Sequence, residues 1–243
     1  DFIIIDNRLE EFYIDTKLIQ KLCNRNFGIG ADGLILLESH NQSNYFMNYF
    51  NSDGLPASLC GNGSMCCGHF ASRLNILNNS DLNFKGSFAT REGVFDIVVN
   101  ENNLVCMQMP HVLDYSIINN DIIINTGSPH YIKFAKKIES LDVNKEGADI
   151  RYSQKFLQDG INVTFVEQND SDIFIRTYER GVESETLSCG TGVVAAALSL
   201  WIQKMIHVKN DIIIRTKGGV LQVSFKYNEH MDTFSDITLS NRV

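Results

Sequence analysis

The residues best suited to chemistry are two cysteines that share one local pattern. Cys60 begins the run Cys-Gly-Asn-Gly, Cys189 begins the run Cys-Gly-Thr-Gly, and a stretch of helical character follows each run. A thiol at the start of a helix lies beside backbone N–H groups that have no intrahelical partner, and the helix dipole adds positive charge there. Both effects favour the thiolate, so each motif predicts a thiol whose pKa is lowered.

The glycines of these motifs indicate a second role. Glycine lets backbone N–H groups approach a ligand closely, and such groups at a helix start can hold a carboxylate. One motif alone would favour a structural interpretation, because buried cysteine is usually a small hydrophobe and glycine before a helix is often only a turn. The second copy reverses this preference, because it supplies a matching thiol and a matching anion clamp.

The two motifs lie at matched positions of an internal repeat. Cys60 and Cys189 are 129 residues apart, which is about half of the 243-residue chain. Three further pairs of segments keep this offset to within three residues: Glu38 with Glu167, Thr90–Val94 with Thr216–Val220, and Tyr49–Asn51 with Tyr178–Arg180. Matches in one order at nearly one offset predict a doubled unit.

Two thiols that meet across a shared pocket suit the inversion of a carbon centre. A thiolate removes the Cα proton from one face, and a thiol supplies a proton to the opposite face. The negative charge that develops at Cα is delocalised onto the substrate carboxylate, where helix N-termini stabilise it. This scheme requires neither a metal nor a pyridoxal cofactor, so we expect no cofactor.

The elements that must position these residues are read from apolar periodicity. The stretch 193–201 is apolar nearly all round, which predicts a buried helix. Cys66, Phe70, Leu74 and Leu77 recur at helical spacing after the first motif. The polar segment 139–155 predicts a short helix with loops. Alternating apolar runs predict strands at Asp1–Asp6, Tyr45–Phe50, Gly93–Val99, Leu104–Met109, Asp172–Tyr178, Asp211–Thr216 and Val220–Phe225.

These elements predict an α+β fold of two similar, pseudo-symmetric lobes. Each lobe is expected to be a curved, mainly antiparallel sheet around a central helix. We place the lobes at residues 1–112 and 113–243, with the last strand free to return to the first lobe.

Composition excludes several classes of protein. The formal net charge is −8 without a long basic run, which argues against a nucleic-acid binder. No stretch of 18 apolar residues occurs, so we expect no membrane span. Six cysteines without a disulfide-scaffold spacing predict reduced thiols in a cytoplasm. The segment Asp1–Asp6 is not typical of a signal peptide.

The sequence resembles the diaminopimelate epimerase family along nearly its whole length. The most specific block is YERGVESETLSCGTG at Tyr178–Gly192. Further resemblances, in order, are Asp1-Phe2, RNFGIGADGL at Arg25–Leu34, FNSDG at Phe50–Gly54 before Cys60-Gly-Asn-Gly, TGSPH at Thr126–His130, and Gly160-Ile161-Asn162.

The resemblance implies a role for each matching residue. Cys60 and Cys189 would be the acid/base thiols, and His130 and Glu179 would tune their ionisation. Substrate binding would fall to two sets: the side chains of Asn51, Asn62, Asn162 and Arg180, and the backbone N–H groups of Gly61, Asn62, Gly190 and Thr191. The resemblance also implies two facing lobes, a small amino-acid substrate and a homodimer.

Several positions depart from the family pattern. Ser128 replaces an asparagine, Met65 stands where arginine is common, and Gly33 stands where some members have glutamine. The run ERGVESET is one residue longer than the common ERGxGET, so Glu185 rather than Glu183 matches the second glutamate. These changes fit a lineage variant or an altered substrate.

Other interpretations remain open at this point. A different isomerase of the same two-lobed superfamily, such as a proline racemase-like enzyme, is the nearest alternative, and a non-catalytic binding module is another. A redox protein fits less well, because neither motif has C-x-x-C spacing. Cys23, Cys66, Cys67 and Cys106 are interpreted as core residues. The remaining histidines form no ligand-spaced pair, so we predict no metal site.

Overall fold

The computed structural model describes residues 1–57, 59–80, 82–170, 172–207 and 211–243. The chain divides into two compact units. The first comprises residues 1–108 together with 241–243, and the second comprises residues 109–240.

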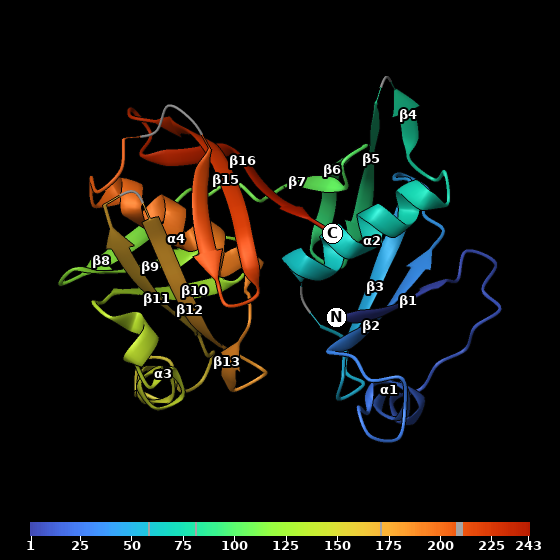
Figure 1. Cartoon of the computed structure of the whole chain (residues 1–243), viewed down its shortest axis with the longest axis horizontal. Coiled ribbons are helices and arrows are strands. Elements are labelled where there is room, and N and C mark those ends of the chain that lie inside the picture. The colour runs from blue at the N-terminus through green and yellow to red at the C-terminus, as the bar shows by residue number, and fades with distance from the viewer. Residues whose placement is uncertain (58, 81, 171, 208–210) are drawn as a thin grey trace. The chain divides into compact units, whose positions relative to one another are not determined.

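The first unit is a sheet that packs around one long helix (Figure 1). Its strand order is β1-β2-β3-β5-β6-β7, with β4 paired to β5. Helix α2 contacts β1, β2, β3, β6 and β7, so the sheet surrounds it on several sides. The elements are β1 (Phe2–Asp6), α1 (Thr16–Cys23), β2 (Gly33–Glu38), β3 (Tyr45–Asn51), α2 (Gly61–Arg73), β4 (Asn78–Ser80), β5 (Asn83–Thr90), β6 (Gly93–Asn100) and β7 (Leu104–Gln108).

The second unit repeats this plan around helix α4 (Figure 1). Its strand order is β16-β15-β14-β12-β11-β10-β9-β8, with β13 paired to β12, and α4 contacts β9, β10, β11, β12, β14 and β15. The elements are β8 (Tyr115–Ile118), β9 (Asp121–Asn125), β10 (Pro129–Phe134), the 3-10 turn η1 (Ile138–Ser140), α3 (Val143–Arg151), β11 (Asn162–Asn169), β12 (Asp172–Glu179), β13 (Ser184–Thr186), α4 (Gly190–Ile202), β14 (Ile212–Thr216), β15 (Gly219–Asn228) and β16 (Thr233–Arg242).

The internal repeat predicted from the sequence is confirmed by matching local geometry. Helices α2 and α4 each have 13 residues and each begin after a cysteine in extended conformation. Parallel pairing joins β1 to β2 and β10 to β11, with α1 and α3 in the respective connections. The two matched hairpins turn at Gly93 and Gly219, whose φ angles are +143° and +144°. Only glycine adopts such angles readily.

Burial of the two central helices differs because their sequences differ. Every residue of α4 from Gly190 to Leu200 is buried, as its continuous apolar sequence predicts. In α2 the buried face is made largely of small residues: Gly63, Ser64, Cys67, Gly68 and Ala71.

The helical spacing of Cys66, Phe70, Leu74 and Leu77 correctly predicted a helix after the first motif, but these larger residues do not form its buried face. Cys66 and Phe70 are only partly buried, Leu74 caps the helix, and Leu77 lies beyond it. Small residues face the sheet because an added Cβ on Gly68 would lie 2.1 Å from Ile97 Cδ1. The interpretation of every remaining cysteine as core also needs correction: Cys23 and Cys67 are buried, whereas Cys66 and Cys106 are partly exposed.

Candidate active site

Each of the two motif cysteines occupies the N-cap of its helix. Cys60 has φ/ψ of −108°/109°, and Cys189 has −118°/109°. The Cys60 carbonyl accepts the first helical bond from Ser64 N–H at 2.8 Å, and that of Cys189 accepts from Val193 N–H at 2.9 Å. The Cys60 Sγ also accepts the Gly63 N–H at 3.4 Å. Each thiol is therefore held at the positive end of a helix dipole, as the sequence predicted.

In the second unit Cys189 belongs to a buried group of side chains. Its Sγ lies 3.5 Å from Thr191 Oγ1. The same hydroxyl lies 2.9 Å from His130 Nε2, and His130 Nδ1 lies 3.1 Å from Thr164 Oγ1. Strand β10 thus places His130 one hydroxyl away from the thiol. Thr191 is fixed in turn because its carbonyl accepts a hydrogen bond from Thr126 Oγ1 at 2.8 Å.

His130 is uncharged in this environment. Its side chain is fully buried. Burial, with a smaller contribution from the positive charge of Arg180, lowers the pKa of His130 to about 3. At neutral pH the imidazole therefore offers one donor and one acceptor, and it cannot act on a thiol as a cation.

Asn162 and Arg180 are held together at the start of β11 and the end of β12. Asn162 Oδ1 accepts the Arg180 backbone N–H at 2.9 Å, and Asn162 Nδ2 donates to Ser128 Oγ at 2.6 Å and to the Pro129 carbonyl at 3.0 Å. The Arg180 guanidinium donates to the Asp159 carbonyl at 3.0 Å. Ser128, the departure from the family pattern, therefore binds and orients the neighbouring asparagine.

Glu179 lies next to the segment that leads into Cys189. Its carboxylate accepts a hydrogen bond from the Thr186 hydroxyl. Thr186 and Cys189 both line one surface hollow of the second unit. The full lining of that hollow is Ile175, Arg176, Thr177, Thr186, Leu187, Ser188, Cys189, Thr216 and Lys217.

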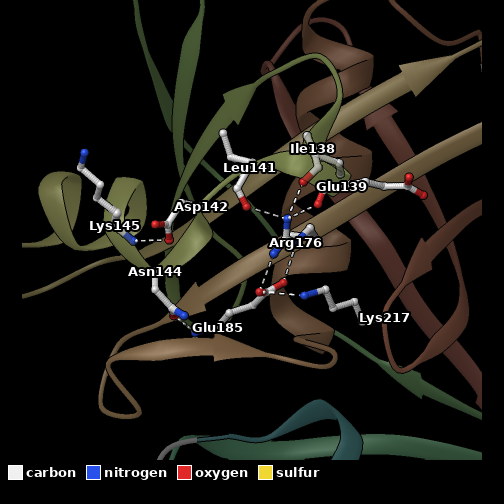
Figure 2. Close-up of polar contacts among 9 residues, drawn as sticks. All are labelled: Ile138, Glu139, Leu141, Asp142, Asn144, Lys145, Arg176, Glu185 and Lys217. Atoms are coloured by element: carbon white, nitrogen blue, oxygen red, sulfur yellow. Dashed lines mark hydrogen bonds and ion pairs between the residues drawn. The ribbon is translucent and has the colours of Figure 1, made fainter.

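A network of ion pairs anchors strand β13 (Figure 2). Two of its members, Arg176 and Lys217, also line the hollow. Arg176 Nε and Nη2 each donate to Glu185 at 2.6 Å, and Lys217 Nζ donates to the same carboxylate at 2.9 Å. Arg176 Nη1 also donates to the carbonyls of Ile138 and Leu141 at 2.5 and 2.8 Å. Burial raises the pKa of Glu185, but the bonds from Arg176 and Lys217 outweigh it, and the pKa lies below its usual value.

The first unit places its predicted residues around the other helix start. Asn51 ends β3, where it pairs with Gly33 and where its backbone bonds Leu55 and Gly54 in a tight turn. Gly61 and Asn62 form the first turn of α2 directly after Cys60. The predicted site residues are therefore divided between the two units. The first unit holds Asn51, Cys60, Gly61 and Asn62. The second unit holds His130, Asn162, Glu179, Arg180, Cys189, Gly190 and Thr191.

The sequence analysis did not identify three threonines that belong to the buried hydrogen-bonded group of Cys189, Thr191 and His130. Thr126, Thr164 and Thr177 are buried and hydrogen-bonded there. Threonine is a common strand residue, so its type alone gave no signal. The two-residue spacing of strands could have revealed two of them. Thr164 follows Asn162 on one face of β11, and Thr177 precedes Glu179 on one face of β12.

Within the described ranges, no three His, Cys, Asp or Glu side chains are arranged to hold a metal ion. Over those same ranges, no helix has the length and apolar character needed to cross a membrane.

The matching family model and two relatives with similar sequences carry the same name. The family model described as diaminopimelate epimerase matches residues 1–112 and 122–237. The chain is 47% identical to diaminopimelate epimerase of Flavobacterium psychrophilum, over 98% of this chain and 91% of the relative. It is 39% identical to the enzyme of the same name from Chlorobaculum tepidum, over 96% of this chain and 91% of the relative.

Solved structures with a similar fold are more distant in sequence. A PhzF-family phenazine biosynthesis protein of Bacillus anthracis matches with a TM-score of 0.70 at 15% identity, covering 98% of this chain and 89% of that one. A probable proline racemase of Agrobacterium radiobacter matches with a TM-score of 0.69 at 15% identity, covering 93% and 78%. These likenesses confirm the two-lobed fold. The family-model match and the identity to the curated relatives together establish that this chain belongs to the diaminopimelate epimerase family.

Proposed function

We propose that this chain interconverts LL- and meso-diaminopimelate, a step toward lysine, by proton transfer at Cα between two cysteines. In this proposal Cys60 and Cys189 flank one carbon of the substrate. One thiolate removes the proton, the other thiol delivers a proton to the opposite face, and the roles exchange for the reverse direction. The reaction takes place in the cytoplasm on a small amino-acid substrate.

The observation that carries this proposal is the paired position of the two thiols. Each unit of a duplicated fold supplies one cysteine, and each cysteine caps a 13-residue helix in nearly the same backbone conformation. A single such thiol serves a one-sided reaction. A matched pair, one from each half, supports a reaction that needs an acid and a base of equal strength on two faces.

The remaining residues bind the substrate and tune the thiols. Backbone N–H groups of Gly61, Asn62, Gly190 and Thr191 hold the carboxylate at the reacting carbon, where charge develops. Asn51, Asn62, Asn162 and Arg180 bind the other polar ends. The hydrogen bonds that fix Asn162 to Arg180 support a role for both in positioning the substrate.

The roles of His130 and Glu179 follow from their contacts. Glu179 bonds Thr186 at the edge of the hollow that Cys189 lines, and His130 bonds Thr191. We assign to Glu179 the handling of protons near Cys189. Because His130 is neutral, we assign it hydrogen bonding rather than electrostatic stabilisation of a thiolate.

The mechanism is tested by removing each thiol separately. Cys60→Ala and Cys189→Ala should each lower kcat for epimerisation by at least about a thousandfold, because one face loses its proton carrier. Cys106→Ala is the matched control, since Cys106 is a partly exposed thiol on β7. If either test variant folds and keeps near-normal turnover, the two-thiol mechanism is wrong.

The substrate is tested by exchange with solvent. Deuterium from 2H2O should enter Cα of diaminopimelate and not that of proline when the wild-type protein is present. Exchange into proline alone would favour a proline racemase-like activity, in line with the fold it shares with a probable proline racemase. Tight binding of diaminopimelate without exchange would favour a binding module.

A further inference from the structure

We propose that Thr164 and Thr177 are positioning residues that hold neutral His130 in its Nε2–H tautomer, so that Thr191 donates its hydroxyl hydrogen to the Cys189 thiolate. This inference rests on the proposed function because it requires Cys189 to be a thiolate during part of the catalytic cycle. It concerns residues on β11 and β12 that have no place in the proton-transfer scheme itself.

The group forms one continuous line of polar atoms through the second unit. From the thiol inward, Sγ to Thr191 Oγ1 is 3.5 Å, Thr191 Oγ1 to His130 Nε2 is 2.9 Å, and His130 Nδ1 to Thr164 Oγ1 is 3.1 Å. The line continues from Thr164 Oγ1 to Thr177 Oγ1 at 3.1 Å. Each pair is close enough to share a hydrogen bond, and the Thr164–Thr177 contact is at the long end for two hydroxyls.

The direction of these hydrogen bonds follows from the thiolate end. A thiolate only accepts, so the Thr191 hydroxyl must donate to it, and the Thr191 oxygen is left to accept. The atom facing that oxygen is His130 Nε2, which must therefore carry the hydrogen. Neutral imidazole has one hydrogen, so Nδ1 is the acceptor and the Thr164 hydroxyl donates to it. Thr177 then donates to the Thr164 oxygen.

Burial makes this order matter. His130 and Thr164 are fully buried, and Thr177 and Thr191 are nearly so. Water therefore cannot easily replace a lost partner, and hydrogen bonds are stronger in such surroundings. The first turn of α4 also packs closely against these residues. A Cβ added to Gly192 would lie 3.1 Å from both the Thr164 and Thr177 hydroxyls and 3.2 Å from His130 Cε1, so a side chain at this position would require its neighbours to shift.

The charged groups that line the hollow with Cys189, or that act on the residues around it, are unchanged in a Thr164 variant, so they do not account for a change in the titration of Cys189. They come from strand β12, from strand β13, and from the residues that follow β12 and β14. These groups are Glu179, Arg180, Arg176, Glu185 and Lys217.

The test is the pH dependence of Cys189 alkylation by iodoacetamide without substrate, followed by mass spectrometry of the peptide. In Thr164→Val the apparent pKa of Cys189 should rise, and alkylation near neutral pH should slow about tenfold, because one hydrogen bond that favours the thiolate is weakened. Thr164→Ser keeps the hydroxyl and should restore the wild-type profile. Cys106 in the same sample is the internal control.

A second measurement needs no variant. In wild-type protein with 15N-labelled histidine, the ring-nitrogen shifts of His130 should show hydrogen on Nε2 at a pH where Cys189 is ionised. Hydrogen on Nδ1 would overturn the proposal, and so would an unchanged Cys189 titration in folded Thr164→Val. Because neither readout uses diaminopimelate, loss of the epimerase proposal would leave both results interpretable.

Discussion

His130 illustrates how its surroundings decide what a residue can do. Free histidine titrates near neutral pH, which makes it a natural candidate for a general base. Burial against Thr191 and Thr164, beside the Arg180 charge, leaves His130 neutral with a pKa of about 3. The sequence predicted its functional location from TGSPH, but its protonation state depended on packing that no short motif encodes.

The first prediction concerns stability and follows from this shift. The pKa of His130 is 6.5 when exposed and about 3 when folded, so the unfolded chain binds the extra proton between these values. Stability from this group is complete above pH 6.5 and is lost as the pH falls toward 3, at up to about 1.4 kcal/mol per pH unit. Urea unfolding between pH 7 and 5 should show this slope, and His130→Asn should lack it. Parallel slopes in the two proteins would contradict the assignment.

At the scale of elements, the helices and strands that could be predicted were those whose apolar residues form a continuous run or a regular alternation. Helix α4 was predicted from its apolar sequence, and strands β3, β6, β12 and β15 from alternation. The buried face of α2 was not predictable in this way, because close packing against Ile97 selects glycine and other small residues that carry no hydrophobic pattern. The polar line through Thr164 and Thr177 was missed because those residues also favour strands.

The second prediction tests the ion pairs that anchor β13. Arg176 and Glu185 are only 11% and 12% exposed, so Glu185→Gln leaves a buried guanidinium without its charge partner. We expect a loss of about 2–3 kcal/mol in unfolding free energy and a lower kcat, because the segment before Cys189 loses its anchor. The matched control is Glu146→Gln in the exposed Lys133–Glu146 pair, which should cost under about 1 kcal/mol. Equal effects of the two substitutions would show that the buried network is unimportant.

The third prediction compares equivalent glycines of the two central helices. In Gly63→Ala the new Cβ meets only side-chain ends, Ile35 Cδ1 and Met47 Cε at 3.3 Å, which can shift. In Gly192→Ala it meets the Thr164 and Thr177 hydroxyls at 3.1 Å. We expect little change in melting temperature or kcat for the first variant, and a clear fall in both for the second. A larger effect at Gly63 would contradict the proposed tight packing around His130.

At the scale of the whole molecule, duplication carried most of what the sequence could reveal. The offset between Cys60 and Cys189, together with the matched Thr90 and Thr216 segments, predicted two lobes of one design, and the structural repeat of α2 and α4 agrees. Differences between the lobes were less accessible, since they lie in single positions. The first pair of the parallel strands β10 and β11 is His130 with Asn162, whereas the equivalent pair of β1 and β2 is Phe2 with Gly33. Only the second lobe therefore carries polar side chains at this position.

In the proposed mechanism, two separate thiols act on the two faces of one carbon. The most direct measurement is the isotope content of both diastereomers at low conversion, starting from LL-diaminopimelate in 2H2O. Newly formed meso product should carry solvent deuterium at the inverted Cα, because its hydrogen comes from a different thiol, while remaining LL substrate should carry almost none. Product that retains the substrate's own hydrogen would indicate a single base serving both faces and would rule out the two-thiol mechanism.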